Sequence, residues 1–497
     1  MALSTPPSPI STLPADILWV IFEINSRSIA SESDQALTHS IRASQVCHSW
    51  RKVILSSTSL WARLINFSNP VVQKEAGRTE ILRRSDGSAP LWIMGRLRTE
   101  ESYRGFFSVL DTHWERIEIL DVDLWEGYSQ NHYQLWRPLF RPAPALRVIK
   151  LPVANYQPPS RYAPPLFGNH APQLTVYHLT GIIEGVSLRP KGSWIPQVRH
   201  IRLSKPLGLS DVLDTLQRAT LLESLIIDTI TVKYPQSLNT IVIPPSIILP
   251  HLKDLRISDC SDEIWFPILK SLAPFPLNSF HFKAANSSLT DDLNQTTSEI
   301  ACENILKFIQ VLRERNRTTH VLRIIFNSLH GVTHFRISLE DSSNLEPVYF
   351  SVNLNGFPRL SGLLMANLAT HSLLSSVQHM HLYLDNDVPD LRASFAHLLS
   401  ALTSLASLRS TDNILEFLLE YCDSRCLPKL HTLILPVLRP RRSWPVGWEG
   451  RYSDGLVMAF LRHRNKVGLP LSVLDLSEAT LRMDMNQLEE IPGLTVR

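Results

Sequence analysis

Residues 13–22 read LPADILWVIF, and this stretch decides how the N-terminal part of the chain folds. A proline near the first helical position costs no hydrogen bond, because the first N–H groups of a helix have no partner within it. Asp16 falls in the first turn, where a carboxylate interacts favourably with the positive end of the helix dipole. Apolar residues then recur at helical spacing as far as Phe22, so the stretch predicts a helix with a sharp apolar face.

Two further helical segments follow within residues 10–67. The second is predicted as one continuous helix through six residues: Leu37, Ile41, Val46, Cys47, Trp50 and Ile54. A short third element holds Leu60, Trp61 and Leu64. Because so small a unit cannot cover all of its own apolar surface, we expect part of that surface to face a partner.

The motifs of this region resemble the F-box. They are, in order, Leu13-Pro14, Ile17, Leu18, Ile21 and Phe22 in the first helix, then Val46-Cys47, Trp50-Arg51 and Leu60-Trp61. The chain departs from the family at Asp16, where glutamate is more usual, and at His48, where a basic residue is common. The resemblance implies docking onto a Skp-family adaptor, and through it onto a cullin-RING complex. An ordinary three-helix N-terminal domain is the alternative.

The docking residues implied by the resemblance are Leu13, Pro14, Ile17, Leu18, Val46, Cys47 and Trp50. Some of the apolar residues must instead hold the helices together. Our interpretation places Ile21, Phe22 and Trp50 in the core, and Pro14 and Leu18 in contact with the adaptor.

Length and composition limit the remaining possibilities. The chain has 497 residues, a hydrophobic share of 44% and a net charge of +3, which favours neither nucleic acid nor membrane as a partner. Its five cysteines are an odd number and, apart from Cys422 and Cys426, lie far apart, as is typical of a reducing compartment. The N-terminus lacks the features of a signal peptide, and no apolar run is long enough to span a bilayer. We expect an intracellular protein of the cytoplasm, the nucleus or both.

Beyond residue 113 one short pattern returns, in which an apolar residue is followed by others three and five positions later. The copies begin at Ile117, Leu146, Leu174, Val198, Leu222, Leu252, Leu277, Val332, Val377, Leu430 and Leu471, with a degenerate copy near Leu405 and Leu408. Most early copies recur every 24 to 30 residues, close to the roughly 20–29-residue period of leucine-rich repeats. The repeats lack a regular Asn or Cys after the strand.

The predicted fold is therefore α/β, with a small three-helix F-box-like domain followed by an irregular leucine-rich-repeat α/β solenoid. Its predicted segments are a disordered tail (1–9), the helical domain (10–67), a connector (68–113) and the solenoid (114–497). A non-solenoid α/β domain with leucine-rich strands is the alternative.

Local patterns predict further elements. The connector has a strand at 91–94 and a helical stretch through Leu110, and helices are expected at 211–218, 298–315, 391–408 and 413–421. A hairpin of 335–339 with 348–352 should project from one repeat. Pro-rich insertions interrupt the series at 137–172 and 436–450.

Side chains alternate between the two faces of a strand, so residues between the apolar positions should line the opposite face. Those residues form a basic column of Arg202, Arg256, His281, Arg336 and His381, with Lys150 and His178 upstream of it. Arginine binds carboxylate and phosphate through paired, charge-assisted hydrogen bonds. The hypothesis is that this face binds an acidic or phosphorylated segment of a client protein. Exposed strand positions that simply tolerate Arg and His are the alternative.

Metal and catalytic motifs are weak or missing. Cys422 and Cys426 with His431 lack a fourth zinc ligand, and Cys422 is expected to pack on a helix instead. His379 and His381 with Asp385 and Asp387 fit exposed strand residues as well as a metal site. The chain has no G-x-S-x-G, GxxxxGK[ST] or GxGxxG motif, so we expect no enzyme activity, cofactor or metal.

We therefore expect a substrate-recognition subunit of an SCF-type cullin-RING ubiquitin ligase. An interaction scaffold that uses both modules outside a ligase is the alternative. An α/β enzyme, such as a hydrolase, is a third possibility.

Overall fold

The computed structural model describes residues 13–26, 35–124, 133–153, 165–181, 192–204, 207–230, 246–285, 295–315, 320–329, 332–341, 350–355, 357–370, 374–384, 392–410, 412–422, 426–435, 454–477 and 485–497. The expected tail at 1–9 and the Pro-rich insertion at 436–450 lie outside these residues. The chain divides into two compact units. Unit 1 is Met1–Leu225 with Leu249–His251, and unit 2 is Ile226–Ile248 with Leu252–Arg497.

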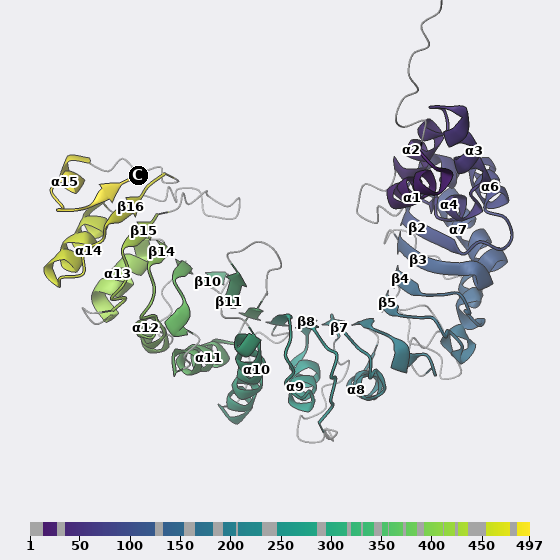
Figure 1. Cartoon of the computed structure of the whole chain (residues 1–497). Coiled ribbons are helices and arrows are strands. Elements are labelled where there is room, and N and C mark those ends of the chain that lie inside the picture. The colour runs from purple at the N-terminus through teal and green to yellow at the C-terminus, as the bar shows by residue number, and fades with distance from the viewer. Residues whose placement is uncertain are drawn as a thin grey trace, which may run out of the picture. The chain divides into compact units, whose positions relative to one another are not determined.

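The protein is mixed α/β. Its described strands form a large, mostly parallel sheet that does not close on itself, and helices alternate with the strands along the chain. Figure 1 shows that the helices of each unit lie along one side of its strands. Within the described ranges, every helix is too short or too polar to cross a bilayer.

Unit 1 opens with four helices: α1 (Ala15–Ser26), α2 (Ala36–Ala43), α3 (His48–Ser56) and α4 (Thr58–Ala62). The prediction of one continuous second helix was wrong, because the chain turns between α2 and α3. The Ser44 hydroxyl donates to the Ile41 carbonyl at 2.6 Å and closes the end of α2. Cys47 is extended, and its Sγ accepts the Trp50 N–H at 3.5 Å, so it caps the start of α3.

Parallel strands follow these helices: β1 (Ile65–Asn66), β2 (Leu91–Leu97), β3 (Ile117–Leu124), β4 (Val148–Val153), β5 (Val176–Gly181) and β6 (His200–Leu203). β7 (Ser224–Asp228) runs across the boundary between the units. The helices between the strands are α5 (Pro70–Gln73), α6 (Glu75–Arg84), α7 (Glu100–His113) and α8 (Leu209–Arg218). Short 3₁₀ helices complete the connections: η3 (Trp114–Arg116), η4 (Tyr133–Phe140), η5 (Leu166–Asn169) and η6 (Ile195–Gln197).

The predicted strand and helix of the connector are confirmed as β2 and α7. β2 pairs with β1 on one side and with β3 on the other. Residues 68–113 therefore contribute a strand to the same parallel ladder that continues through β6.

Unit 2 continues with β8 (Asp254–Cys260), β9 (Ser279–Ala285), β10 (His320–Leu329), β11 (Val332–Asp341), β12 (Phe350–Asn355), β13 (His379–Leu384), β14 (Ser407–Ser410), β15 (Thr432–Ile434), β16 (Val473–Asp475) and β17 (Thr495–Val496). Its helices are α9 (Asp262–Ser271), α10 (Gln295–Arg315), α11 (Pro358–Thr370), η8 (Leu374–Ser376), α12 (Arg392–Ser400), α13 (Asp412–Tyr421), α14 (Asp454–Lys466) and α15 (Met485–Glu489). The helix predicted over 391–408 was too long, because the degenerate copy near Leu408 forms β14.

An antiparallel insert interrupts the parallel order of unit 2. β12 pairs with β11 and β11 with β10, both antiparallel, while β12 lies parallel to β9 and β10 lies parallel to β13. The predicted pairing of the hairpin is confirmed, with Leu339 opposite Phe350, but the hairpin does not project from a repeat, because β12 also pairs with β9 and β11 with β10 in the same sheet. The copy at Val332 is not another parallel repeat, because β11 is the middle strand of this insert.

The apolar positions of the copies form the core. From Ile117 to Leu225 in unit 1, and at Ile227, Leu255, Phe280, Met380, Leu408, Leu433 and Leu474 in unit 2, these side chains are buried. Burying one such side chain contributes about 1.5–3 kcal/mol. Alternation then leaves the intervening residues on the face away from the helices, where the predicted client-binding residues lie.

Candidate protein-interaction surfaces

Helix α1 is apolar on two of its faces. Leu18 and Phe22 face inward, and Leu18 is only 1% exposed. On the other side Ile17, Val20, Ile21 and Ile24 are 45%, 42%, 39% and 62% exposed. We call these four residues the α1 stripe. Their i, i+3, i+4, i+7 spacing places them on one face of the helix, which is unusual for a face that only meets water.

The structure corrects two predictions about this helix. Leu18, predicted as an adaptor contact, belongs to the core, and Ile21, predicted as a core residue, is exposed. Phe22 is buried as predicted, and Trp50 packs edge-on against it with ring centroids 5.2 Å apart. Helical spacing alone cannot distinguish the two sides, because both are apolar.

The other predicted docking residues differ in exposure. Pro14 and Val46 are exposed, whereas Leu13 and Cys47 are half-buried. Val46 lies in the turn that precedes α3, and Ile41 of α2 is a further exposed aliphatic residue. Sequence reasoning missed Val20, Ile24 and Ile41, although the spacing of Val20 and Ile24 from Ile17 was the available signal.

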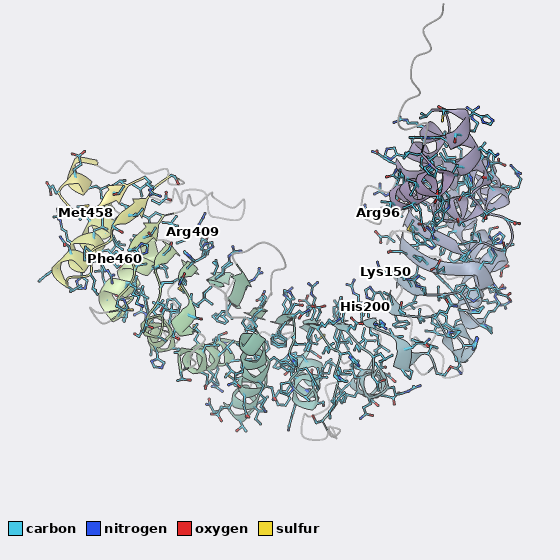
Figure 2. The ribbon with its side chains drawn as sticks, in the orientation of Figure 1. Arg96, Lys150, His200, Arg409, Met458 and Phe460 are labelled. Carbon is cyan, nitrogen blue, oxygen red and sulfur yellow. The ribbon has the colours of Figure 1, made fainter. Side chains whose placement is uncertain are left out.

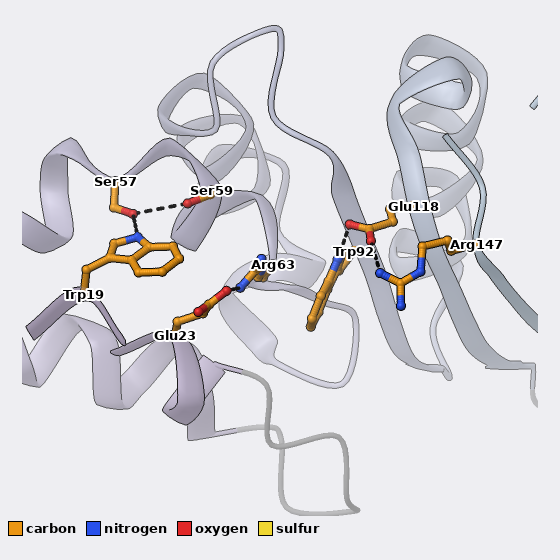
Figure 3. Close-up of polar contacts among 8 residues, drawn as sticks. All are labelled: Trp19, Glu23, Ser57, Ser59, Arg63, Trp92, Glu118 and Arg147. Atoms are coloured by element: carbon orange, nitrogen blue, oxygen red, sulfur yellow. Dashed lines mark hydrogen bonds and ion pairs between the residues drawn. The ribbon is translucent and has the colours of Figure 1, made fainter. Parts of the chain in front are cut away.

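Five side chains connect α1 to the first strands of unit 1 (Figure 3). Glu23 of α1 forms an ion pair with Arg63, and the Arg63 guanidinium lies over the Trp92 ring, 4.7 Å from its centroid. Trp92 Nε1 donates to Glu118 at 2.9 Å, and Arg147 donates to the other oxygen of Glu118, also at 2.9 Å. We call these residues the relay. It spans α1, the end of α4, strands β2 and β3, and the residue before β4.

A second contact fixes the same helix. Trp19 Nε1 donates to the Ser57 hydroxyl at 2.9 Å, and Ser57 lies 3.5 Å from the Ser59 hydroxyl (Figure 3). Together with the relay, this bond orients α1 so that Trp19, Phe22 and Glu23 face the rest of unit 1. The α1 stripe is thereby left on the outside.

In unit 1 the predicted basic column is confirmed in register but not in charge. Strand pairing aligns Asp121, Lys150, His178 and Arg202 across β3 to β6. Lys150 donates to Asp121 at 2.8 Å, so its charge is compensated within the sheet. Figure 2 shows Lys150 and His200 on the side of the strands away from the helices. Burial, and then the charges of Lys150 and Arg202, lower the pKa of His178 to about 4.

In unit 2 strand pairing builds one row across seven neighbouring strands. In spatial order from β8 to β14, the row is Arg256, His281, Ser351, Ser338, Arg323, His381 and Arg409. We call it the unit 2 row. Sequence reasoning missed Arg323 and Arg409. Arg323 lies on the unrecognised strand β10, although alternating apolar residues at Leu322 and Ile324 were a signal for that strand.

Arg336 was predicted in the same column as His281. This was wrong, because the residue aligned with His281 lies two positions further along β11. Because β11 runs antiparallel, Ser338 occupies the position in the row, and Arg336 pairs with Asn353, which in turn pairs with Lys283. Arg336 still lies close enough to His281 to act on it. Burial lowers the pKa of His281, and the charges of Arg256 and Arg336 lower it further.

The charges along this face are unevenly compensated. Lys283 forms an ion pair with Asp259 at 2.7 Å, and Arg409 lies near Asp475, whose pKa is lowered mainly by hydrogen bonds from Ser477. Arg256 and Arg336 are exposed, and neither has a hydrogen bond or ion pair with another described residue. This part of the face therefore presents cations to solvent.

The weaker metal candidates can also be placed. His379 and His381 lie on the same face of β13, while Asp385 and Asp387 lie outside the described residues. The Cys422 and Cys426 thiols interact with each other, and His431 Nδ1 lies 2.9 Å from the Thr432 hydroxyl. Across the described ranges, no three His, Cys, Asp or Glu side chains are arranged to hold a metal ion.

The site is thus two surfaces of different chemistry: an exposed aliphatic stripe on α1 in unit 1, and a cationic row in unit 2. Each surface is built on packed helices or strands. Comparison with known proteins gives no family model and no curated sequence that matches this chain.

Proposed function

We propose that this protein is the substrate-recognition subunit of an SCF-type cullin-RING ubiquitin ligase. In this proposal the helices α1 to α4 form an F-box-like domain that docks onto a Skp-family adaptor. The strand-rich remainder acts as an irregular leucine-rich-repeat solenoid and holds a client protein. The chain contributes proximity, since holding client and ligase together raises the effective concentration of one for the other.

The α1 stripe is the observation that carries the proposal. Ile17, Val20, Ile21 and Ile24 expose a continuous aliphatic face, although Leu18 and Phe22 already supply the core contacts of the helix. A helix that is apolar on both sides gains stability when the second side is also covered. The stripe coincides with the stretch whose sequence resembles the F-box.

The packing of α1 supports the same proposal. The relay and the Trp19–Ser57 hydrogen bond fix α1 to the first strands of unit 1. A docking helix held in this way transmits its orientation to the strands that follow it. A receptor needs such coupling, because a freely tumbling head would not present a client at a defined distance.

The experiment is capture of the adaptor from cell extract by the full-length chain. Replacing Ile17 and Ile21 with serine should weaken capture at least about tenfold, because two aliphatic anchors are lost. The matched control replaces Leu221 and Ile248 with serine. These are also exposed aliphatic residues, but they lie outside helices α1 to α4. The control should retain the adaptor.

The same capture separates the ligase from the scaffold. A complex that contains both adaptor and cullin supports a ligase subunit, whereas adaptor without cullin supports a scaffold. Equal capture by the wild type and by the Ile17→Ser, Ile21→Ser variant would contradict docking through α1.

A further inference from the structure

The unit 2 row is long and its charges are spread along it. Neighbouring strands lie about 4.8 Å apart, so the six steps from Arg256 on β8 to Arg409 on β14 cover about 29 Å. An extended peptide rises about 3.3 Å per residue, so about nine residues would cover this distance. The row therefore matches a segment of chain better than it matches a single ionic group.

The antiparallel insert supplies the centre of this surface. β10 contributes Arg323 and β11 contributes Arg336, and both strands lie between β9 and β13. The insert separates β9, which carries His281, from β13, which carries His381. It places the two arginines between these strands. The insert thus extends the row and adds positive charge where the parallel ladder is interrupted.

Three polar groups in the same region have no partner among the described residues. Arg256 and Arg336 bind no carboxylate among the described residues, and both are exposed. The Ser338 hydroxyl, in the centre of the row, is buried and has no hydrogen-bond partner in the described part of the chain. Buried polar groups are normally satisfied, so an unsatisfied one between arginines is consistent with a site that a ligand completes.

The chemistry of the row favours a protein ligand over nucleic acid. Single-stranded nucleic acids are usually bound by a basic groove combined with aromatic side chains on which the bases stack. The row itself contains arginine, histidine and serine but no phenylalanine, tyrosine or tryptophan, and the whole chain has a net charge of only +3. Arginine and serine side chains donate readily to carboxylates spaced along an extended peptide.

We propose that the unit 2 row, together with Arg336 beside it on β11, binds an extended acidic segment of about nine residues, laid across strands β8 to β14, with its carboxylates distributed along the row. Because this segment would belong to the client of the proposed receptor, the inference rests on the proposed function and specifies its substrate class. Recognition depends on several carboxylates and requires no phosphate group.

The test is fluorescence anisotropy with full-length protein and a labelled peptide of alternating Glu and Ser, about nine residues long. The acidic peptide should bind, its affinity should fall as salt increases, and the matching Gln–Ser peptide should not bind. The double variant Arg256→Glu, Arg336→Glu should weaken binding about tenfold or more, and Arg256→Gln, Arg336→Gln should have a smaller effect.

The matched control introduces the same change in charge on helices. Lys270 of α9 and Lys466 of α14 are exposed, and Lys270→Glu, Lys466→Glu should leave peptide affinity unchanged. Because all the replaced side chains are exposed, the variants should fold, and circular dichroism verifies this. Equal loss in the control would show general charge attraction and overturn the site.

Two competing ligands decide the chemical class. The competitors are an otherwise neutral peptide with a single phosphoserine and a single-stranded oligonucleotide. If either binds more tightly than the Glu–Ser peptide, and this binding is lost in the Arg256→Glu, Arg336→Glu variant, the acidic-segment site is overturned. Adaptor capture, measured in parallel, reports on the proposed function alone. Peptide binding without adaptor capture would reject the ligase role and keep the peptide site. Adaptor capture without peptide binding would reject only the peptide site.

Discussion

The guanidinium of Arg63 lies 4.7 Å from the centroid of the Trp92 ring and forms an ion pair with Glu23 of α1. The side chains of Arg63 and Glu23 are only 17% and 11% exposed, so solvent screens their attraction weakly. Arg63 follows α4 and Trp92 lies on β2. One arginine therefore connects the helix that carries the α1 stripe with the first strands of the sheet.

This connection predicts measurable coupling between residues 63 and 92. In a double-mutant cycle with Arg63→Ala and Trp92→Leu, the interaction energy should be about 0.5–2 kcal/mol, because the pair is largely desolvated. Urea unfolding of the four proteins measures it. If the changes in unfolding free energy of the two single variants simply add in the double variant, the contact does not help to hold helices α1 to α4 on the sheet.

Substitutions on the two faces of α1 should change stability by very different amounts. Leu18→Ala should lower the free energy of unfolding by about 2–5 kcal/mol, because a fully buried side chain leaves a cavity. Ile21→Ala should change stability by about 0.5 kcal/mol or less, because Ile21 is exposed. Chemical denaturation of both variants gives the comparison, and a larger loss for Ile21→Ala would reverse the assignment of the two faces.

Gly95 on β2 should not tolerate a side chain. Its φ is +107°, and an added Cβ would lie 2.1 Å from Asn66 Oδ1 and 2.8 Å from the Phe67 nitrogen. Gly95→Ala should therefore destabilise the protein by more than about 2 kcal/mol, since left-handed backbone strain adds to the clash.

Gly87→Ala is the matched control, because nothing lies within 4 Å of its Cβ and its φ is outside the left-handed region. The control should be neutral or stabilising by up to about 1 kcal/mol. Melting temperatures of the two variants test the contrast, and equal melting temperatures would contradict it.

His178 predicts how stability depends on pH. Its pKa is lowered to about 4 in the folded protein, mainly by burial, while an unfolded histidine titrates near pH 6.5. Between these values the unfolded state binds more protons, so this contribution to stability is complete above pH 6.5 and is lost as the pH falls towards 4.

Urea midpoints at pH 7.5, 6 and 5 should therefore fall more for the wild type than for His178→Gln, which has no titrating ring. Lys150 and Arg202 repel the imidazolium, and Asp121 acts in the opposite direction. Parallel pH profiles for the two proteins would exclude His178 as the source of the slope.

Local pattern predicted much of this structure. The strand positions of the copies, from Ile117 onward, were identified from apolar spacing, and their burial follows because alternation places such residues on one face. The hairpin around Leu339 and the helices α7, α8, α10 and α13 were found in the same way. Alternation also predicted that Arg202, Arg256, His281 and His381 face away from the core.

Errors arose wherever the answer depended on a distant partner. Leu18 and Ile21 are both strongly apolar, and only the packing of α1 against neighbouring helices, as in the contact between the Phe22 and Trp50 rings, selects the inward side. Arg336 left the predicted row because β11 runs antiparallel, which its own residues do not encode. Lys150 lost its free charge to Asp121, about thirty residues earlier in the chain.

The sequence by itself determined which residues of each strand point inward and which part of the chain forms the helical head, because periods of 2 and 3.6 are properties of a local backbone. The tertiary structure alone decided which strands are neighbours, which side of α1 stays exposed and which cations along the sheet remain without a carboxylate. Those outcomes depend on contacts between residues far apart in the chain, whose energies are compared only when the elements pack together.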